Sequence, residues 1–384
     1  MYDHIEETID EMPGSSGNQY SNLTPSQEED WRDLFQLIAE EEFAAVAAMA
    51  GDLEYRLLRF IDNAGAMNRE FFVLEKTTGG GHYWGTYVFR PDACRRLVIQ
   101  CPHPRVDSNT GKQGIYVYQN SDAYAYFLSG THRCNHLSPT ACSGSTSVCG
   151  SNATYRRSDV AHNTLAGFHL ATEVLYDHFE DLRFIQLHGF GQQSGDPFVI
   201  MSNGSRNTPN MDLAANIRDG LLTADPALTF KIGHLDLAWN RLLAFTNTQG
   251  RYINQSTDAC TSNATTGNGR FLHIEQEYSR LRANEQQWAK MLTAVESAIG
   301  CHTVAIQESA SIDPVFWFSQ TDRALHFDLP GGGPAYRFVF FNFLGQVLKQ
   351  QEISAQSTIF LPDSGPGFFS VWDGGRWVTG GKIF

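Results

Sequence analysis

The sequence predicts an α/β domain with a mainly parallel sheet flanked by helices, followed by a small antiparallel β-sandwich module. Apolar runs typical of strands alternate with segments of helical periodicity over roughly residues 51–300. After about residue 310, only short apolar runs remain, separated by turn clusters such as "DLPGGGPAY" and "PDSGPG". The chain has 384 residues, of which 42% are hydrophobic, enough for one large and one smaller core. We therefore expect a flexible segment over 1–24, an α/β domain over 25–310 and a β-sandwich over 311–384.

The N-terminal region contains one clear helix-start signal. Residues 1–24 are polar and contain Gly, Ser and Asn, which predicts a flexible lead-in. Thr24 is then suited to cap a helix that has Pro25 at its first position. Trp31, Leu34 and Ile38 follow at helical spacing. We expect a helix from residue 25 onward.

Several strands and helices are expected after Gly51. The predicted strands are "REFFVLEK" (69–76), "HYWGTYVF" (82–89), "RRLVIQC" (95–101), "LRFIQLHGF" (182–190), "FVIMSNG" (198–204) and the start of 270–299. The predicted helices are 159–179, 211–224 and the remainder of 270–299. Functional groups of such sheets gather where strands end and loops begin, as in "QCPHP", "QLHGF" and "HIEQE".

The charge balance excludes one broad class of function. The chain carries 42 acidic and 28 basic residues, a formal net charge of −14. A nucleic-acid-binding protein needs a basic face to displace counterions from phosphate, so we expect no nucleic-acid partner. No stretch approaches the roughly 20 apolar residues of a membrane span. The start, "MYDHIEETID", lacks the features of a signal peptide, so the chain is either cytosolic or a mature chain without its leader.

The cysteines favour the second alternative, a secreted or cell-surface protein. Three of the seven lie in the Ser/Thr/Gly-rich stretch "CNHLSPTACSGSTSVCG", where paired cysteines are usual. A structural zinc site is the alternative, but no Cys-x-x-Cys pair exists. We expect disulfides whose pairing the spacing does not give. The odd count leaves a free thiol, for which Cys94 and Cys101 are the candidates.

Three predicted strand ends supply residues suited to a zinc site. Zinc hydrolases use two or three His, Asp or Glu ligands, an open position for water, and a carboxylate that moves the proton. His103, Asp107 and His188 are the candidate ligands, and Glu275 is the candidate base. Glu277 competes for that role because strand alternation places it on the same face.

Each of these residues also has a structural interpretation. A single histidine among 13 is more often a structural or surface residue than a ligand. Glu275 could instead form an ion pair with Arg280 or Arg282. His273, on the same strand face as Glu275, could support a ligand from behind. Only the combination of the three strand ends favours a metal centre.

The segment "PHPRVDSNT" resembles the His-plus-acid turn of zinc-dependent amidohydrolases and carboxypeptidases, including N-formylglutamate amidohydrolases and poly-γ-glutamate hydrolases. Those families have a turn Pro-His-Gly-Gly-x-x-Glu-x-x-Thr, a later His-Gly, and a strand ending in Glu. The resemblance maps the turn onto His103, Asp107 and Thr110, the His-Gly onto His188–Gly189, and the late Glu onto Glu275. It implies a Zn²⁺ cofactor and cleavage of an amide bond.

The turn departs from the family pattern in three ways. Pro104 and Arg105 replace the two glycines, the acid is Asp107 rather than Glu, and the spacing is one residue shorter. These departures keep a second hypothesis open, that of a non-catalytic surface or adhesive protein on a degenerate hydrolase fold.

The resemblance also implies arginines that grip a substrate carboxylate through a bidentate fork. Arg133, Arg280 and Arg282 are the candidates, with a structural role as the alternative for each. Asp159 and His162, in "DVAHNT", could line the site, although a helix cap is the favoured role for Asp159.

The C-terminal stretch resembles the sorting domain of the type IX secretion system of Bacteroidetes. The pattern combines Gly345 and Val347, the run Pro366–Phe368, and Lys382 in the final strand. The resemblance implies outer-membrane export through the type IX machinery, and an accessory or carbohydrate-binding β module is the alternative. Together, these features predict a secreted zinc-dependent hydrolase that cleaves an amide bond in a peptide, peptidoglycan stem or acyl-amino acid.

Overall fold

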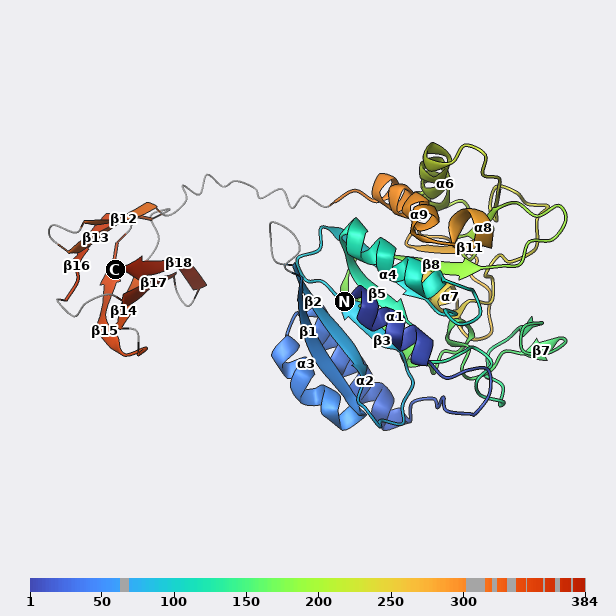
Figure 1. The fold of residues 1–384 in the computed structure, drawn as a ribbon, viewed down its shortest axis with the longest axis horizontal. Coiled ribbons are helices and arrows are strands. Elements are labelled where there is room, and N and C mark those ends of the chain that lie inside the picture. Colours follow the sequence, from blue (N-terminus) through green and yellow to red (C-terminus); the bar gives the residue numbers. More distant parts are fainter. Residues whose placement is uncertain are drawn as a thin grey trace. The chain divides into compact units, whose positions relative to one another are not determined.

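The computed structural model divides the chain into two compact units, Met1–His302 and Thr303–Phe384 (Figure 1). The structure describes residues 1–62, 69–301, 315–319, 323–329, 336–342, 344–354, 356–362, 367–373 and 376–383. The expected boundary at 310/311 falls in 302–314, outside the described residues. None of the helices in the described ranges is long and apolar enough to span a bilayer.

A nine-stranded mixed sheet forms the centre of the first unit, in the order β1-β2-β3-β5-β4-β8-β11-β9-β10. Its strands are β1 (Tyr55–Asp62), β2 (Arg69–Lys76), β3 (Thr86–Phe89), β4 (Arg95–Cys101), β5 (Ala123–Leu128), β8 (Arg183–Gly189), β9 (Val199–Ser202), β10 (Phe230–Ile232) and β11 (Phe271–Gln276). The central strands β5, β4, β8 and β11 run parallel, so their carboxyl ends meet at one edge. A separate short ribbon pairs β6 (Ser145–Thr146) with β7 (Ala153–Thr154).

Helices lie on both faces of this sheet, because its central strands carry buried residues on both faces. They are α1 (Tyr2–Glu11), α2 (Pro25–Ala39), α3 (Phe43–Ala50), α4 (Thr110–Ser121), α5 (Gly167–His178), α6 (Leu213–Ala224), α7 (Thr248–Ile253), α8 (Tyr278–Leu281) and α9 (Glu285–Ala298), with 3₁₀ turns η1 (Gly51–Leu53) and η2 (Val160–His162). In β4, Leu97 and Ile99 enter the core beneath α4 and α9, whereas Val98 enters the core beneath α2 and α5. The predicted α/β class is therefore confirmed.

The N-terminal segment differs from the prediction of a flexible lead-in. Tyr2–Glu11 forms α1, whose Ile5 and Ile9 are buried in the main core. The helix is fixed further where Arg105 donates to the carbonyl of Asp10 at 2.9 Å. The two isoleucines are four residues apart and so share one helical face, a signal hidden by the polar residues between them.

Two predicted helix starts have different outcomes. Thr24 caps α2 as expected, in a capping box with Gln27. The helix expected over 159–179 instead begins at Gly167, after the short η2 turn. Asn163 is extended, and its side-chain oxygen accepts from the backbone N–H of Leu165, so the chain turns before the helix begins.

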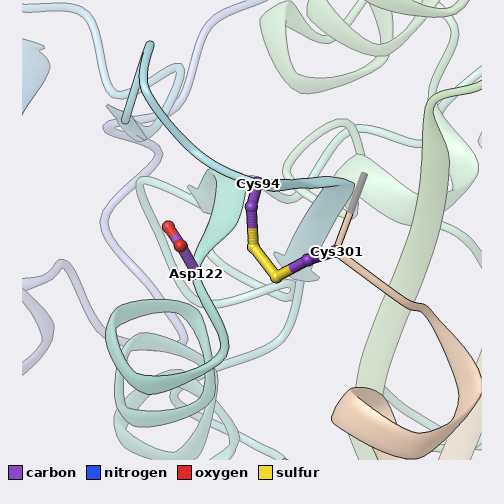
Figure 2. A group of neighbouring side chains, drawn as sticks. All are labelled: Cys94, Asp122 and Cys301. Atoms are coloured by element: carbon purple, nitrogen blue, oxygen red, sulfur yellow. A yellow bond between two sulfur atoms is a disulfide. The ribbon is translucent and has the colours of Figure 1, made fainter. Parts of the chain in front are cut away.

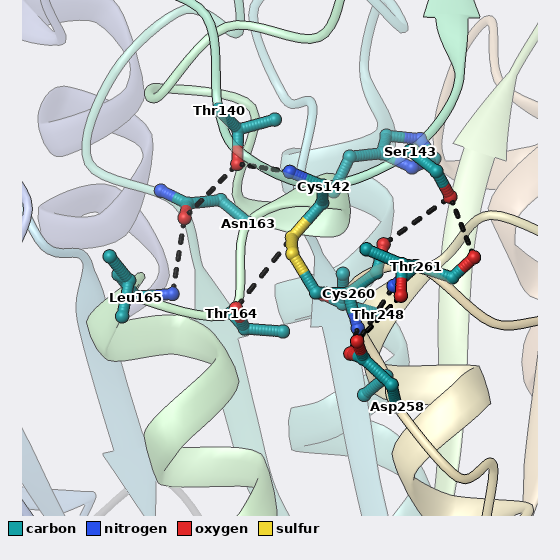
Figure 3. The surroundings of a disulfide bond; sticks show 12 residues. Thr140, Cys142, Ser143, Asn163, Thr164, Leu165, Thr248, Asp258, Cys260 and Thr261 are labelled. Carbon is teal, nitrogen blue, oxygen red and sulfur yellow. Dashed lines mark hydrogen bonds between the residues drawn. A yellow bond between two sulfur atoms is a disulfide. The ribbon is translucent and has the colours of Figure 1, made fainter.

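Three disulfides confirm the prediction for the cysteines. They are Cys94–Cys301, Cys134–Cys149 and Cys142–Cys260, and Cys101 is the buried free thiol. Cys94–Cys301 ties the start of β4 to the residues after α9, with Asp122 beside it (Figure 2). Cys142–Cys260 ties the 130–165 loop to the loop after α7 (Figure 3).

The second unit contains two small antiparallel sheets. One is β12-β13-β16 and the other is β15-β14-β17-β18. The strands are β12 (Val315–Ser319), β13 (Ala324–Asp328), β14 (Tyr336–Asn342), β15 (Val347–Ile353), β16 (Gln356–Phe360), β17 (Gly367–Asp373) and β18 (Arg376–Ile383). Phe327 of one sheet packs on Phe338 and Phe369 of the other, which confirms the predicted β-sandwich.

The residues of the sorting-type pattern fall at three places in this sandwich. Gly345 has a positive φ of 78° just before β15, and Val347 begins that strand. Phe368 in β17 pairs with Lys382 in β18. Pro366 lies outside the described residues. The assignment to type IX secretion stays a prediction.

Candidate metal centre

The candidate site lies at the carboxyl edge of the parallel strands. β4 ends at Cys101, and the chain then makes a tight turn in which the backbone N–H of Asp107 donates to the carbonyl of His103 at 2.9 Å. This turn places the His103 and Asp107 side chains on the same side, as at positions i and i+4 of a helix. His188 stands near the end of β8, the strand next to β4. Adjacent strand ends thus bring all three side chains together.

The three candidate ligands converge on one point. The Nδ1 atoms of His103 and His188 are 3.1 Å apart. The Oδ2 atom of Asp107 lies 3.2 Å from Nδ1 of His188 and 3.5 Å from Nδ1 of His103. His103, His188 and Asp107 are only 2%, 3% and 6% exposed. Two nitrogens and one carboxylate oxygen therefore meet in a space that solvent hardly reaches.

The far side of each histidine ring is held by an oxygen atom. Nε2 of His103 lies 2.8 Å from the Asp159 carboxylate, and Nε2 of His188 lies 3.3 Å from Oε1 of Gln186. Both oxygens are acceptors. An ionised carboxylate such as that of Asp159 can only accept, and the Gln186 oxygen also accepts from Asn247 at 2.7 Å. A proton on each Nε2 leaves each Nδ1 as a lone pair that points to the shared space.

A zinc ion fits this set of residues. Zinc–nitrogen and zinc–oxygen bonds of ~2.0–2.2 Å in a tetrahedron place neighbouring ligand atoms roughly 3.2–3.6 Å apart. The observed separations of 3.1, 3.2 and 3.5 Å match that spacing. Three protein ligands would leave a fourth position for water or substrate, as in catalytic rather than structural zinc sites.

The charges of the site stabilise the anionic carboxylates. Burial opposes ionisation of Asp107, but hydrogen bonds and the charges of both histidines hold the pKa of that carboxyl well below its usual range. Burial likewise opposes ionisation of Asp159, but Arg133 and His103 lower its pKa. Burial lowers the pKa of His188 to about 4, although the hydrogen bond to Asp107 opposes part of this shift. His188 is therefore neutral at physiological pH, the state needed in a ligand.

His103 shows the competition between a proton and a metal ion. Burial and Arg133 oppose a charge on the ring, but Asp159 and Asp107 outweigh them and raise the pKa of His103. Arg133 also directs Nη1 at Nδ1 of His103 from 3.3 Å. In acid a proton competes with a metal ion for this nitrogen, so we expect metal affinity to fall as the pH is lowered.

Glu275 lies beside these ligands. It pairs in register with His188 across the neighbouring strands β8 and β11. It is 7% exposed, and its Oε2 has no hydrogen-bond partner among the described residues. Burial and the nearby charge of Asp107 raise the pKa of Glu275 to about 8, against the opposing effect of Arg133 and Arg282. A carboxylate of this kind exchanges a proton near neutral pH.

The competing acid, Glu277, has a different environment. β11 ends at Gln276, so Glu277 lies beyond the strand instead of alternating along it. Its side chain caps α8, where it accepts from the backbone N–H groups of Ser279 and Arg280 at 2.8 and 2.9 Å. The structure therefore does not place Glu277 with the three candidate ligands.

The three candidate arginines also separate. Arg133 is buried against Asp159 at 2.8 Å and reaches His103. Arg282 donates to the backbone carbonyls of Ser108 and Gln276, and its guanidinium covers Gly189 so closely that a Cβ there would lie 2.2 Å from Cζ.

Arg280 is placed differently, because it forms a salt bridge with Asp225 at 2.7 Å. No described contact links it to the candidate ligands. The alternative ion pair of Glu275 with Arg280 or Arg282 is not formed.

Asp159 and His162 also belong to the surroundings of the site. The favoured helix-cap role of Asp159 is wrong, because its side chain makes no cap hydrogen bond and holds His103 instead. His162 stacks on Tyr155 with ring centroids 3.6 Å apart, and its Nδ1 is held by the Thr246 carbonyl.

Sequence reasoning missed two of the residues near the site. Arg241 lowers the pKa of Glu275 and forms a salt bridge with Asp196. No motif in "WNRLLAF" indicates that this arginine lies near the site. Gln186 carried a signal, because a polar residue two positions before His188 lies on the same face of a buried strand.

Comparisons with known proteins found similarities only among solved structures. No protein-family model matches the chain, and no curated protein matches it. The chain is similar to an N-formylglutamate amidohydrolase from Ralstonia eutropha, with 12% identity over 56% of this chain and 94% of that one, at a TM-score of 0.32. It is similar to thrombin activatable fibrinolysis inhibitor, with 12% identity over 67% and 74% of the two chains, at a TM-score of 0.33. It is also similar to a Legionella pneumophila aminopeptidase, LapA, with 9% identity over 78% and 69%, at a TM-score of 0.29.

Proposed function

We propose that this protein is a secreted zinc-dependent hydrolase that cleaves an amide bond. The observation that carries the proposal is the convergence of His103, His188 and Asp107, with donor atoms 3.1–3.5 Å apart, beside the buried Glu275 carboxylate. The Oε2 atom of that carboxylate has no hydrogen-bond partner among the described residues. Nucleophilic catalysis has no comparable support, since the sequence has no Gly-x-Ser-x-Gly elbow and the free thiol of Cys101 is buried.

His103, His188 and Asp107 would hold the zinc ion. When bound there, zinc polarises a carbonyl group and makes water a stronger acid near neutral pH. Asp159 keeps the His103 ring in the orientation that a ligand needs, and Arg133 fixes Asp159 through its Nε at 2.8 Å. Gln186 does the same for His188.

Glu275 is the proposed general base. As a carboxylate it takes a proton from the attacking water and then gives that proton to the leaving nitrogen of the amide. In the metal-free protein the pKa of Glu275 is raised to about 8, which brings this carboxyl close to the neutral range in which a group can accept and release a proton at low cost. Neither step needs Glu277, whose side chain is used as a helix cap.

The arginines around the site favour an anionic substrate. The positive charges of Arg133, Arg241 and Arg282 all lower the pKa of Glu275, although Arg133 is paired with Asp159 and Arg241 with Asp196. An amide substrate with a nearby carboxylate would gain from this field. The proposed substrates are peptides, peptidoglycan stems or acyl-amino acids.

The proposal of secretion rests on a separate set of observations. Three disulfides are typical of proteins that work in an oxidising compartment. Export through the type IX secretion machinery is proposed from the C-terminal sequence pattern and its place on a β-sandwich.

Zinc content and amide hydrolysis, measured on the same preparations, test the enzymatic proposal. We expect zinc in the wild-type protein, its loss in His103→Ala and His188→Ala, and hydrolysis of acyl-amino acids or peptides only by the zinc-bound form. Zinc binding without hydrolysis across these substrate classes would favour the non-catalytic surface protein. Equal, negligible zinc in all three proteins would refute the metal centre itself.

A further inference from the structure

Two neighbouring strands of the central sheet carry buried glutamines near their carboxyl ends. Gln100 in β4 and Gln186 in β8 pair in register, and both are fully buried. Nε2 of Gln186 donates to Oε1 of Gln100 at 2.9 Å and to Oε1 of Gln249 at 3.0 Å. Oε1 of Gln186 accepts from Asn247 at 2.7 Å and faces Nε2 of His188 at 3.3 Å. Both donors and both acceptor lone pairs of this amide are therefore engaged.

The orientation of Gln186 is fixed by backbone groups that lie beyond its partners. Nε2 of Gln249 donates to the carbonyl of Val160 at 2.8 Å, and a carbonyl can only accept. The oxygen of Gln249 must then face Gln186, which meets it with an NH2 group. Oδ1 of Asn247 accepts from the backbone N–H of Gly250 at 2.8 Å, so the NH2 group of Asn247 meets the oxygen of Gln186. Both anchors require the same orientation.

A third anchor acts through Gln100. The hydroxyl group of Thr172 donates to the carbonyl of Phe168 at 2.8 Å, so its oxygen is left to accept from Nε2 of Gln100, also at 2.8 Å. The oxygen of Gln100 then faces Gln186. Reversal of Gln186 would set oxygen against oxygen and NH2 against NH2 among side chains that solvent does not reach. Buried polar groups without partners are costly, so the observed orientation is strongly preferred.

We propose that Gln100, Gln249 and Asn247 are positioning residues that select the tautomer of His188. Among the described residues, none of the three forms a hydrogen bond with a candidate metal ligand, so they act through Gln186. The Gln186 oxygen favours a proton on Nε2 of His188 and leaves Nδ1 as a lone pair. That lone pair points to the other two candidate ligands. The effect on zinc rests on the proposed function, but the tautomer does not.

Asn247 allows the donor to be changed while the helix cap is kept. It is the N-cap of α7, and Asn, Asp and Ser cap helices about equally well. Asn247→Ser keeps a capping oxygen and removes the NH2 group. Asn247→Asp keeps the capping oxygen and presents an acceptor to Gln186 in place of a donor. The added negative charge alone would strengthen the binding of a cation, so a loss of zinc affinity would have the opposite sign from a simple charge effect.

The experiment measures the tautomer of His188 in the metal-free full-length chain, by nitrogen NMR of histidine-labelled protein, and zinc affinity by competition with a chelator. In the wild type we expect a proton on Nε2 of His188. In Asn247→Asp we expect the form with a proton on Nδ1 to appear and zinc affinity to fall about 10–100-fold, as for other outer partners of a ligand. Asn247→Ser should show a smaller loss, and it serves if the Asp variant fails to fold. Asn284→Asp, the same change at the exposed N-cap of α9, is the matched control and should change neither quantity.

A purely structural role for the buried amides gives a different result. In that case the wild type, Asn247→Ser and Asn247→Asp differ at most in stability and share one tautomer and one zinc affinity, which would overturn the proposal. A rise in zinc affinity in Asn247→Asp would overturn it as well. The tautomer is measured without zinc. A wild-type protein that binds no zinc would therefore refute the proposed function, and the nitrogen spectra alone would then decide the role of the amides.

Discussion

The Nδ1 atoms of His103 and His188 face each other across 3.1 Å, although the two residues are 85 positions apart in the chain. Each ring is turned by an oxygen at its far nitrogen, Asp159 for His103 and Gln186 for His188. The two lone pairs are therefore preorganised toward a common point.

Removal of the carboxylate behind His103 should weaken metal binding. Asp159→Asn deprives His103 of a charged partner and leaves Arg133 without its salt bridge, so the ring is no longer held in one orientation. We expect zinc affinity to fall about 10–100-fold, as is usual for such outer partners. Competition with a chromophoric chelator measures it. Asp219→Asn on the exposed face of α6 is the control, and an equal loss of affinity there would contradict the account.

The two candidate bases should be separable. Glu275→Gln keeps the shape of the side chain but cannot take a proton, so kcat should fall by about 10²- to 10⁴-fold. Zinc should stay bound to His103, Asp107 and His188. Glu277→Gln should leave kcat nearly unchanged and cost about 1 kcal/mol of stability or less through the cap of α8. Steady-state kinetics with zinc analysis measures both, and the reverse order of kcat values would refute the assignment.

The stability of the metal-free protein should depend on pH through Glu275. Its pKa is raised from 4.5 to about 8 in the fold, so the native state binds more protons than the unfolded state between these values. The contribution of Glu275 to stability is therefore present below pH 4.5 and is lost as pH rises through about 8. Urea unfolding at pH 5 and pH 8 should show a smaller pH dependence in Glu275→Gln than in the wild type. Identical pH dependence in both would contradict the raised pKa.

The disulfide pattern predicts the reactivity of the thiols. Cys101 is fully buried, with Gly114 packed so closely that a Cβ there would lie 2.3 Å from its sulfur, and the other six cysteines are paired. Without reductant, we expect no rapid reaction of the native protein with a thiol reagent and one reactive thiol after unfolding. More than one thiol in the unfolded, unreduced chain would refute the pairing.

The strand ends of the site could be predicted because local patterns determine them. Leu97–Ile99 is an apolar run that must be buried, and the proline-flanked His103 follows it at once. The same holds for His188 and Glu275, and parallel neighbours then bring their ends to one edge. The prediction that Glu277 shares a strand face with Glu275 was wrong, because β11 ends at Gln276, one residue before Glu277.

The rest of the site depends on contacts that no local pattern contains. Asp159 and Arg133 reach His103 from a loop held by Cys134–Cys149 and Cys142–Cys260, and spacing does not give those pairings. Arg241 likewise comes from an irregular loop. Such residues are positioned by tertiary structure, so their roles were visible only once the fold had brought distant segments together.

Zinc-edge anomalous diffraction from crystals of the zinc-bound protein tests the central claim most directly. We expect a strong anomalous peak ~2.0–2.2 Å from Nδ1 of His103, Nδ1 of His188 and a carboxylate oxygen of Asp107. Crystals of the zinc-treated protein with no peak between these three side chains would contradict it.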